Sequence, residues 1–128
     1  RPLLFFLLFS LSSFGQQLKF DNFTTNQGLS NNSVAAIESD RDGGLWIATW
    51  DGLNYFDGTN FRVYKNDSND PKTISSNYIT KLKKDSAGNI WLITKEGYLN
   101  QYLGNDEFKE FKFKRISIAS ELYKYRQS

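Results

Sequence analysis

Few side chains in this 128-residue chain are suited to catalysis, and the densest group of them is acidic. Glu38, Asp40, Asp42, Asp51 and Asp57 lie close together in the sequence, and a pair of carboxylates is what a glycosidase uses. All of them except Glu38 lie in or beside turns, where an aspartate accepts hydrogen bonds from nearby backbone N–H groups. We therefore expect these carboxylates to build turns and not to catalyse a reaction.

The residues that most often act in catalysis and metal binding are absent. With no histidine and no cysteine, the chain lacks the commonest general base, thiol nucleophiles, disulfides and zinc-thiolate sites. Asp40-x-Asp42-Gly43 resembles the start of a calcium loop but lacks the distal glutamate of the full pattern. The net charge of +2 gives no electrostatic reason to expect a nucleic-acid partner. The sequence predicts no enzymatic activity, metal or cofactor for this segment.

An internal repeat identifies the elements that position these residues. Leu45-Trp46-Ile47-Ala48-Thr49 returns as Ile90-Trp91-Leu92-Ile93-Thr94, and the offset of 45 (91 − 46) also relates Leu29 to Ile74 and Gly43 to Gly88. One extra residue, Tyr98, follows Gly97 in the second copy. Each copy holds short runs of β-branched and aromatic residues separated by Gly-containing turns, which is typical of a small antiparallel sheet. A repeat of this length and composition predicts a propeller blade.

The predicted fold class is therefore all-β, a β-propeller fragment of about two four-stranded antiparallel blades. Blade 1 covers 33–65, a linker with Pro71 covers 66–77, and blade 2 covers 78–113. The expected strands are Ser33–Ser39, Leu45–Trp50, Leu53–Phe56, Phe61–Lys65, Tyr78–Lys84, Ile90–Thr94, Tyr98–Leu103 and Phe108–Phe113.

Some strand residues carry more specific expectations. Val34 and Ile37 are expected to be buried, the segment Leu45–Trp50 is expected to be buried on both faces, and Trp46 and Trp91 are expected to fill the space between blades. The residues assigned to the structural blade motif are Val34, Ile37, Asp40, Gly43, Leu45, Trp46, Ile47, Thr49, Gly52, Asp85, Gly88, Ile90, Trp91, Thr94 and Gly97.

The ends of the chain predict parts of a larger protein. Residues 1–15 begin with one positive charge and a short apolar run, which favours a cleaved secretory signal over a buried helix or an uncleaved anchor. Residues 16–32 are expected to form an orphan outer strand at Lys19–Thr24 and a loop, the strand completing a blade formed by residues beyond Ser128. Residues 114–128 fit the start of a degenerate third blade, with a short helix as the alternative.

The order of strands in a blade places one set of loops on a single face. The loop before the first strand and the turn between the second and third strands both emerge there. Trp50 lies in such a turn beside Asp51, and Asn31 and Asn32 lie in such a loop. Aromatic and amide side chains together suit an oligosaccharide ligand, so these four residues are the predicted ligand-binding site. The competing interpretation is that Trp50 only covers the edge of the blade.

The repeat resembles a known family. Leu29-Ser30-Asn31-Asn32, Leu45-Trp46-Ile47-x-Thr49 and Asp51-Gly52-Leu53-Asn54-x-Phe56-Asp57-Gly58 are similar to the two-component regulator propeller repeat. The resemblance covers Phe20 to about Phe113, and the second copy departs from the pattern at Glu96 and Leu103. It implies the periplasmic sensor half of a Bacteroidetes hybrid two-component receptor, whose partners would be the remaining blades and downstream domains of the same chain.

The resemblance also implies a function and leaves an alternative. The whole receptor would be a homodimer anchored in the inner membrane that senses glycan oligosaccharides and controls polysaccharide-utilisation genes through a histidine kinase outside this segment. The alternative is a secreted propeller without a kinase, acting as an interaction scaffold or a polysaccharide lyase. Sequence downstream of Ser128 would distinguish the two.

Overall fold

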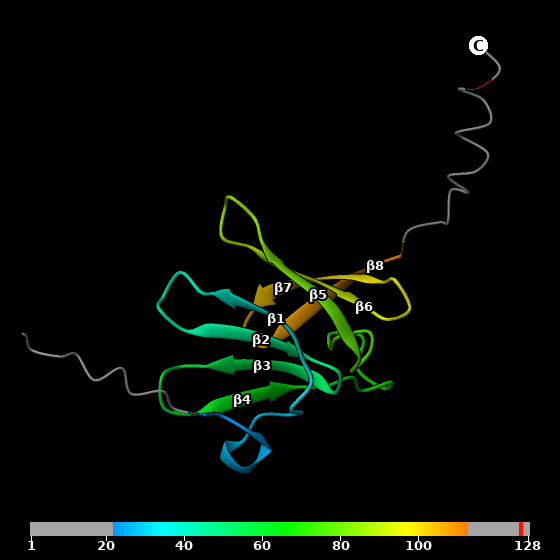
Figure 1. Ribbon diagram of the computed structural model, residues 1–128. Helices are drawn as coiled ribbons and strands as arrows, with labels where there is room; N and C mark the ends of the chain where they lie inside the picture. The colour runs from blue at the N-terminus through cyan, green and yellow to red at the C-terminus, as the bar shows by residue number, and fades with distance from the viewer. Residues whose placement is uncertain (1–21, 113–125, 127–128) are drawn as a thin grey trace, which may run out of the picture.

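The fold consists of two four-stranded antiparallel sheets that follow one another along the chain (Figure 1). It is seen in a computed structural model that describes residues 22–112 and Arg126. In both sheets the strands run in sequence order, each joined to the next by a short turn. This up-and-down meander is the predicted blade, and the all-β class and the two-blade organisation are confirmed.

The first sheet contains β1 (Val34–Ser39), β2 (Leu45–Thr49), β3 (Gly52–Phe56) and β4 (Phe61–Tyr64). The second contains β5 (Ile79–Lys84), β6 (Ile90–Thr94), β7 (Leu99–Gly104) and β8 (Glu107–Phe111). Each strand lies within two residues of its predicted position, and the linker between the sheets contains no strand. The register shifts between Val34 and Ala36 in β1 and between Ile79 and Lys81 in β5, so the repeat extends to an irregularity at the same point of both blades.

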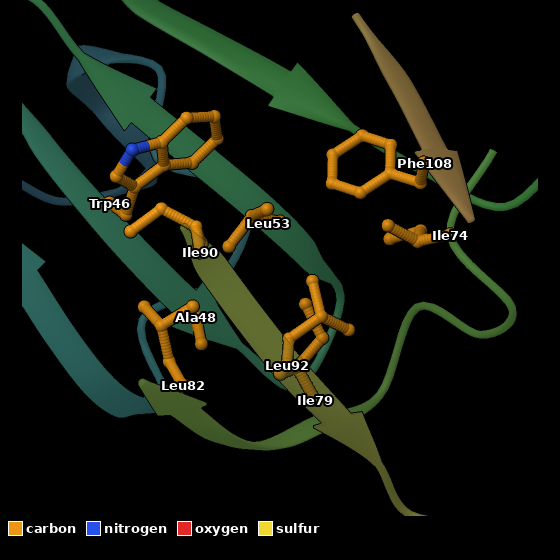
Figure 2. Packing of buried hydrophobic residues seen from close by; sticks show 9 residues of the cluster. All are labelled: Trp46, Ala48, Leu53, Ile74, Ile79, Leu82, Ile90, Leu92 and Phe108. Atoms are coloured by element: carbon orange, nitrogen blue, oxygen red, sulfur yellow. The ribbon is translucent and has the colours of Figure 1, made fainter. Parts of the chain in front are cut away.

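The core lies between the two sheets (Figure 2). Side chains alternate along a strand, so Trp46 and Ala48 of β2 share one face of the first sheet with Leu53 of β3, and that face packs on the second sheet. This face packs on Leu82, Ile90, Leu92 and Ile79 of the second sheet. Ile74 and Phe108 close the far end of the cluster. Trp46 is only 3% exposed and its ring lies 4.7 Å from that of Tyr102 in the neighbouring blade, as expected for a residue that fills the space between blades.

The expectation that Val34 and Ile37 are buried is wrong. Val34 is 43% exposed and Ile37 is 57% exposed. Ile37 pairs with Ile47, so alternation directs it to the face of the first sheet that points away from the second sheet. The equivalent residues of blade 2, Ile79 and Leu82, are buried because their face packs on blade 1. The segment Leu45–Trp50 is likewise not buried throughout, since Leu45 and Trp50 at its ends are exposed.

The chain before β1 forms a capped turn. Thr24 caps a short 3-10 helix, η1 (Thr25–Gln27), and Gly28 ends it in the left-handed conformation. Phe23 packs on Phe56 and Phe61, with ring centroids 4.9 and 5.7 Å away. Asn22–Thr24 form no strand in the described part of the chain; the rest of the predicted orphan strand, the signal segment and the predicted third blade lie outside the described residues.

Candidate functional site

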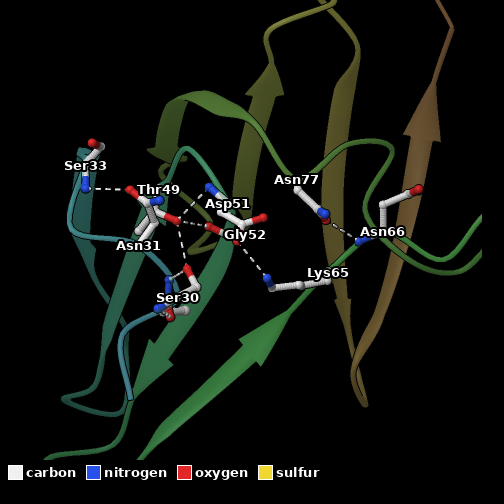
Figure 3. A network of polar contacts seen from close by, with 10 residues as sticks. Ser30, Asn31, Ser33, Thr49, Asp51, Gly52, Lys65, Asn66 and Asn77 are labelled. Atoms are coloured by element: carbon white, nitrogen blue, oxygen red, sulfur yellow. Dashed lines mark hydrogen bonds and ion pairs between the residues drawn. The ribbon is translucent and has the colours of Figure 1, made fainter. Parts of the chain in front are cut away.

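A buried hydrogen-bond network joins the loop before β1 to the strands of blade 1 (Figure 3). The Ser30 backbone N–H donates to Asn54 Oδ1 over 2.9 Å, and Asn54 Nδ2 donates back to Ser30 Oγ over 2.7 Å. Thr49 Oγ1 lies 2.7 Å from Ser30 Oγ and donates to the Gly52 carbonyl. Asn54 and Thr49 are fully buried. Because buried polar groups need partners, this network gives the repeated Leu-Ser-Asn-Asn and Leu-Asn motifs a structural purpose.

Blade 2 repeats the serine–asparagine part of the network but not the hydrogen bonds of the threonine hydroxyl. Ser75 N donates to Asn100 Oδ1 over 2.9 Å, and Asn100 Nδ2 donates to Ser75 Oγ over 2.7 Å. Thr94, the equivalent of Thr49, is buried, but its Oγ1 has no partner among the described residues. The extra residue Tyr98 lengthens the turn after β6, and its carbonyl accepts from the Thr94 backbone N–H over 3.1 Å.

Asn31 and Asn32, both predicted to contact a ligand, are engaged by the local backbone. Asn31 Oδ1 accepts from the Ser33 N–H over 2.7 Å, and Asn32 Oδ1 accepts from the Thr25 N–H over 2.9 Å. Short-range bonds of this kind fix loops. The two side-chain oxygens therefore shape the loop before β1, and only the amide nitrogens remain for a ligand.

The loops that were predicted to share a face do lie together. The Gly52 N–H of blade 1 donates to the Asn77 carbonyl in the linker over 2.7 Å, and the Asn77 side chain accepts from the Asn66 N–H over 2.6 Å (Figure 3). Asp51, another predicted ligand contact, pairs with Lys65 over 2.8 Å at the surface. The Gly52–Asn77 contact therefore fixes the linker against the turn of blade 1, just before blade 2 begins.

Trp50 is the most exposed aromatic side chain on this face. It is 51% exposed and stacks on Tyr78 of blade 2, with ring centroids 5.3 Å apart and an interplanar angle of 16°. Lys95 Nζ lies 5.0 Å from the centre of the Tyr78 ring, a cation–π contact. Sequence reasoning missed Tyr78 and Lys95. The offset of 45 relates Trp50 to Lys95 and Ser33 to Tyr78, but it does not indicate which residues of different blades lie in contact.

Asp57 accepts hydrogen bonds within its turn, as expected, whereas the side chains of Asp40 and Asp51 bind Tyr55 and Lys65 instead. Asp57 Oδ1 accepts from the N–H groups of Asn60 and Thr59, and these bonds lower the pKa of its carboxyl group. Asp85 accepts from the Trp91 indole and from Asn89, which hold its pKa at about 2. Among residues 22–112, no group of three or more acidic side chains is placed to hold a metal ion.

Comparison with known proteins is consistent with this geometry. Residues 28–51 and 73–96 match the family model described as "Two component regulator propeller". These two segments run from the loop before each first strand to the turn after each second strand, and so contain Trp46 and Trp91. The chain carries two-component regulator propeller repeats.

Two relatives extend the comparison. Histidine kinase P4 of Formosa agariphila is 46% identical over 70 residues, which is 55% of this chain and 5% of that kinase. The extracellular domain of a hybrid two-component system from B. thetaiotaomicron has a similar fold, with a TM-score of 0.65 and 34% identity over 73% of this chain and 13% of that one. The propeller chain thus spans a small part of both relatives. Its described residues include no helix with the length and apolar character of a membrane span.

Proposed function

We propose that this propeller chain belongs to the extracytoplasmic sensor domain of a hybrid two-component receptor and recognises an oligosaccharide. The observation that carries the receptor assignment is the match of both repeats, together with the 34% identity to an extracellular domain of such a system. Repeats of this type are binding and scaffolding units, so the phosphotransfer chemistry belongs to other domains of the receptor. Its location is the periplasm, and its output is transcription of genes for glycan use.

The face around Trp50 supports an oligosaccharide as the ligand. Sugar rings have apolar C–H faces that pack on exposed aromatic rings and hydroxyl groups that need nearby polar partners. Trp50 is held in place by its stack on Tyr78, so it loses little conformational freedom when a ligand packs against its other face. Polar groups lie near it: Asp51 follows it in the chain and Lys95 lies over the Tyr78 ring. The Trp50 N–H also donates to the Ser33 carbonyl, which follows Asn31 and Asn32 in the chain.

The test is Trp50→Ala in the complete receptor. We expect oligosaccharide affinity, measured by calorimetry, to fall by at least about tenfold, because the stacking surface is lost. The matched control is Val63→Ala, which shortens an exposed apolar side chain of β4 away from this face. Unchanged affinity in Trp50→Ala with an unchanged melting temperature would rule out this face as the ligand site.

A receptor assignment also predicts what the ligand does. Binding at the propeller should change autophosphorylation of the kinase in membranes that contain the complete receptor. A propeller that is exported without any attached kinase domain would contradict the assignment and favour an interaction scaffold or a lyase.

A further inference from the structure

The end of the blade junction opposite the Trp50 face is held by polar side chains. Lys84 Nζ of blade 2 donates to the Ser39 carbonyl of blade 1 over 2.9 Å and lies 3.1 Å from Ser39 Oγ. Arg62 of blade 1 pairs with Asp106 of blade 2 over 2.7 Å, and the Tyr64 hydroxyl donates to the same carboxylate oxygen over 2.6 Å. Each of these contacts joins one blade to the other.

The first contact joins two positions that are equivalent in the repeat. The offset of 45 relates Ser39 to Lys84, so the two blades have different side chains at this point. If one copy of blade 2 docked on another, Lys84 would meet a second lysine in the place of Ser39. The ammonium lies only 3.1 Å from Ser39 Oγ, so the two positive charges would be brought close together. Like charges at such a contact disfavour the wrong partner.

The second contact depends on a turn that also differs between the blades. Asn105 and Asp106 join β7 to β8 with φ of +52° and +61°, a conformation that few residues other than glycine adopt. The corresponding turn of blade 1 has Gly58 at φ of +103°, and the Asp57 carboxylate there accepts two backbone N–H groups of its own turn. A junction between two copies of blade 1 would therefore replace the Asp106 carboxylate by one that is already engaged.

The apolar surfaces between the blades do not make this distinction. Val34 and Ile37 of blade 1 are as apolar as their counterparts Ile79 and Leu82 in blade 2, and both blades have a tryptophan on the opposite face. Hydrophobic packing alone would accept either blade as a neighbour. Docking of the wrong copies is a characteristic failure of repeat proteins during folding.

We propose that Lys84 and Asp106 are specificity residues that direct blade 2 to blade 1 and disfavour docking between like blades, within one chain or between two chains. Both contacts are exposed at the surface, where a single ion pair adds little to stability. Their effect lies in the difference between the correct junction and the wrong ones. This inference does not depend on the ligand proposed for the Trp50 face.

The charge at position 39 tests the first contact in the complete receptor. Ser39→Lys reproduces the lysine pair of a junction between two copies of blade 2, Ser39→Glu gives Lys84 an opposite charge, and Ser39→Gln is the uncharged control of similar length. We expect hydrogen exchange in a peptide covering the β5–β6 turn to be at least about threefold faster in Ser39→Lys than in Ser39→Gln, and slowest in Ser39→Glu. The differences should shrink at about 1 M salt. Equal exchange in all three variants would overturn the role of Lys84.

A double-mutant cycle tests the second contact. Arg62→Gln and Asp106→Asn each remove one charge, and asparagine tolerates the left-handed conformation at position 106. Because the two residues pair, each variant should speed hydrogen exchange in the β7–β8 turn, and the double variant should add little to either single one. Strictly additive effects would overturn the pairing.

The specificity itself needs a readout that the contacts alone would not change. The variant Lys84→Ser with Asp106→Asn gives blade 2 the serine of blade 1 and removes the free carboxylate. We expect the protease-resistant fraction of newly made receptor in cells to fall at least about twofold, while the melting temperature of the purified folded fraction changes little. An unchanged resistant fraction would overturn the proposal. A fall that is matched by a large drop in melting temperature would also overturn it, because the contacts would then act only through stability.

Discussion

Single hydroxyl groups distinguish the two blades. Thr49 and Thr94 occupy the same repeat position and are both buried, but only Thr49 has hydrogen-bond partners among the described residues. Removing a satisfied buried group leaves its partners unpaired, whereas removing an unsatisfied one relieves a cost. The same substitution should therefore have different effects at the two positions.

We therefore compare the effects of Thr49→Val and Thr94→Val on the free energy of unfolding. Thr49→Val is expected to lower the free energy of unfolding by about 1–2 kcal/mol, and Thr94→Val to leave it unchanged or raise it slightly. Denaturant titration of both variants measures the difference. Equal losses would show that the Thr94 hydroxyl has a partner that the described residues do not include.

The Asp85 carboxylate predicts a dependence of stability on pH. The Trp91 indole, Asn89 and the Ala87 N–H hold its pKa at about 2, below the ordinary value of 3.8. A carboxylate with a lowered pKa stabilises the fold above its unfolded-state pKa, and this contribution is lost as the pH falls toward the folded-state value. The window is therefore about pH 4 to about pH 2.

The measurement is the melting temperature at about pH 5 and about pH 2.5. The parent protein should lose more between these conditions than Asp85→Asn, which has no charge to lose at this position. Trp91→Phe, which removes the largest contribution to the shift, should lie between them. A drop in Asp85→Asn as large as that of the parent would assign the acid sensitivity to other carboxyl groups, such as Asp106, whose pKa is also lowered.

The β2–β3 turn is the element that connects the two blades on the Trp50 face. Gly52 has φ of +127°, and a Cβ there would lie 2.9 Å from the Tyr64 carbonyl oxygen. The N–H of the same residue donates to the Asn77 carbonyl in the linker that leads to blade 2. Gly97 has the equivalent place in blade 2 with φ of +87°, but a Cβ there would meet nothing within 4 Å.

Gly52→Ala is therefore expected to destabilise the protein more than Gly97→Ala. Both replacements place an alanine at a positive φ, which destabilises the fold by about 1 kcal/mol. Only Gly52→Ala also brings a Cβ into contact with the backbone. Thermal unfolding compares the two, and equal shifts of the melting temperature would contradict the clash. If the turn sets the angle between the blades, Gly52→Ala should also alter the fluorescence of Trp50, whereas Gly97→Ala should not.

Most of the elements were predictable because their determinants are local. Pairs such as Asp57-Gly58 mark turns, and the repeat offset carries the strands of one blade onto the other. Burial was less predictable: Ile37 and Leu82 have the same place in their blades, and only the neighbouring sheet decides which one is covered. The Trp50–Tyr78 stack joins residues from different repeats, so neither copy alone could indicate it.

At the scale of the whole molecule, one face of the first sheet is an exposed apolar surface. Ile37, Val34, Leu45 and Val63 contribute to it, and Phe23 adds to its edge. Three of their counterparts in blade 2, Ile79, Leu82 and Ile90, lie against blade 1, so the repeat itself shows that this type of face receives another sheet. Exposed apolar patches of this kind promote association.

Residues 22–112 expressed alone are therefore expected to self-associate or to unfold in part. The double variant Ile37→Lys with Val63→Lys should remain monomeric in sedimentation at concentrations where the parent segment associates. Ser68→Lys with Asn69→Lys places the same added charge in the exposed linker and is the control. A parent segment that is monomeric and melts cooperatively would contradict this prediction.

The two surfaces of each sheet are different, and this has an evolutionary consequence. The Trp46 side of one blade fits the Leu82 side of the next, so a tandem duplication of one unit yields a neighbour that already matches its template. Blades can therefore be added to such an array without earlier coevolution of the surfaces between them. Each added blade has the same orientation as the one before it. Side chains such as Tyr55 and Gln101 can then differ between blades while this fit between neighbouring sheets is kept.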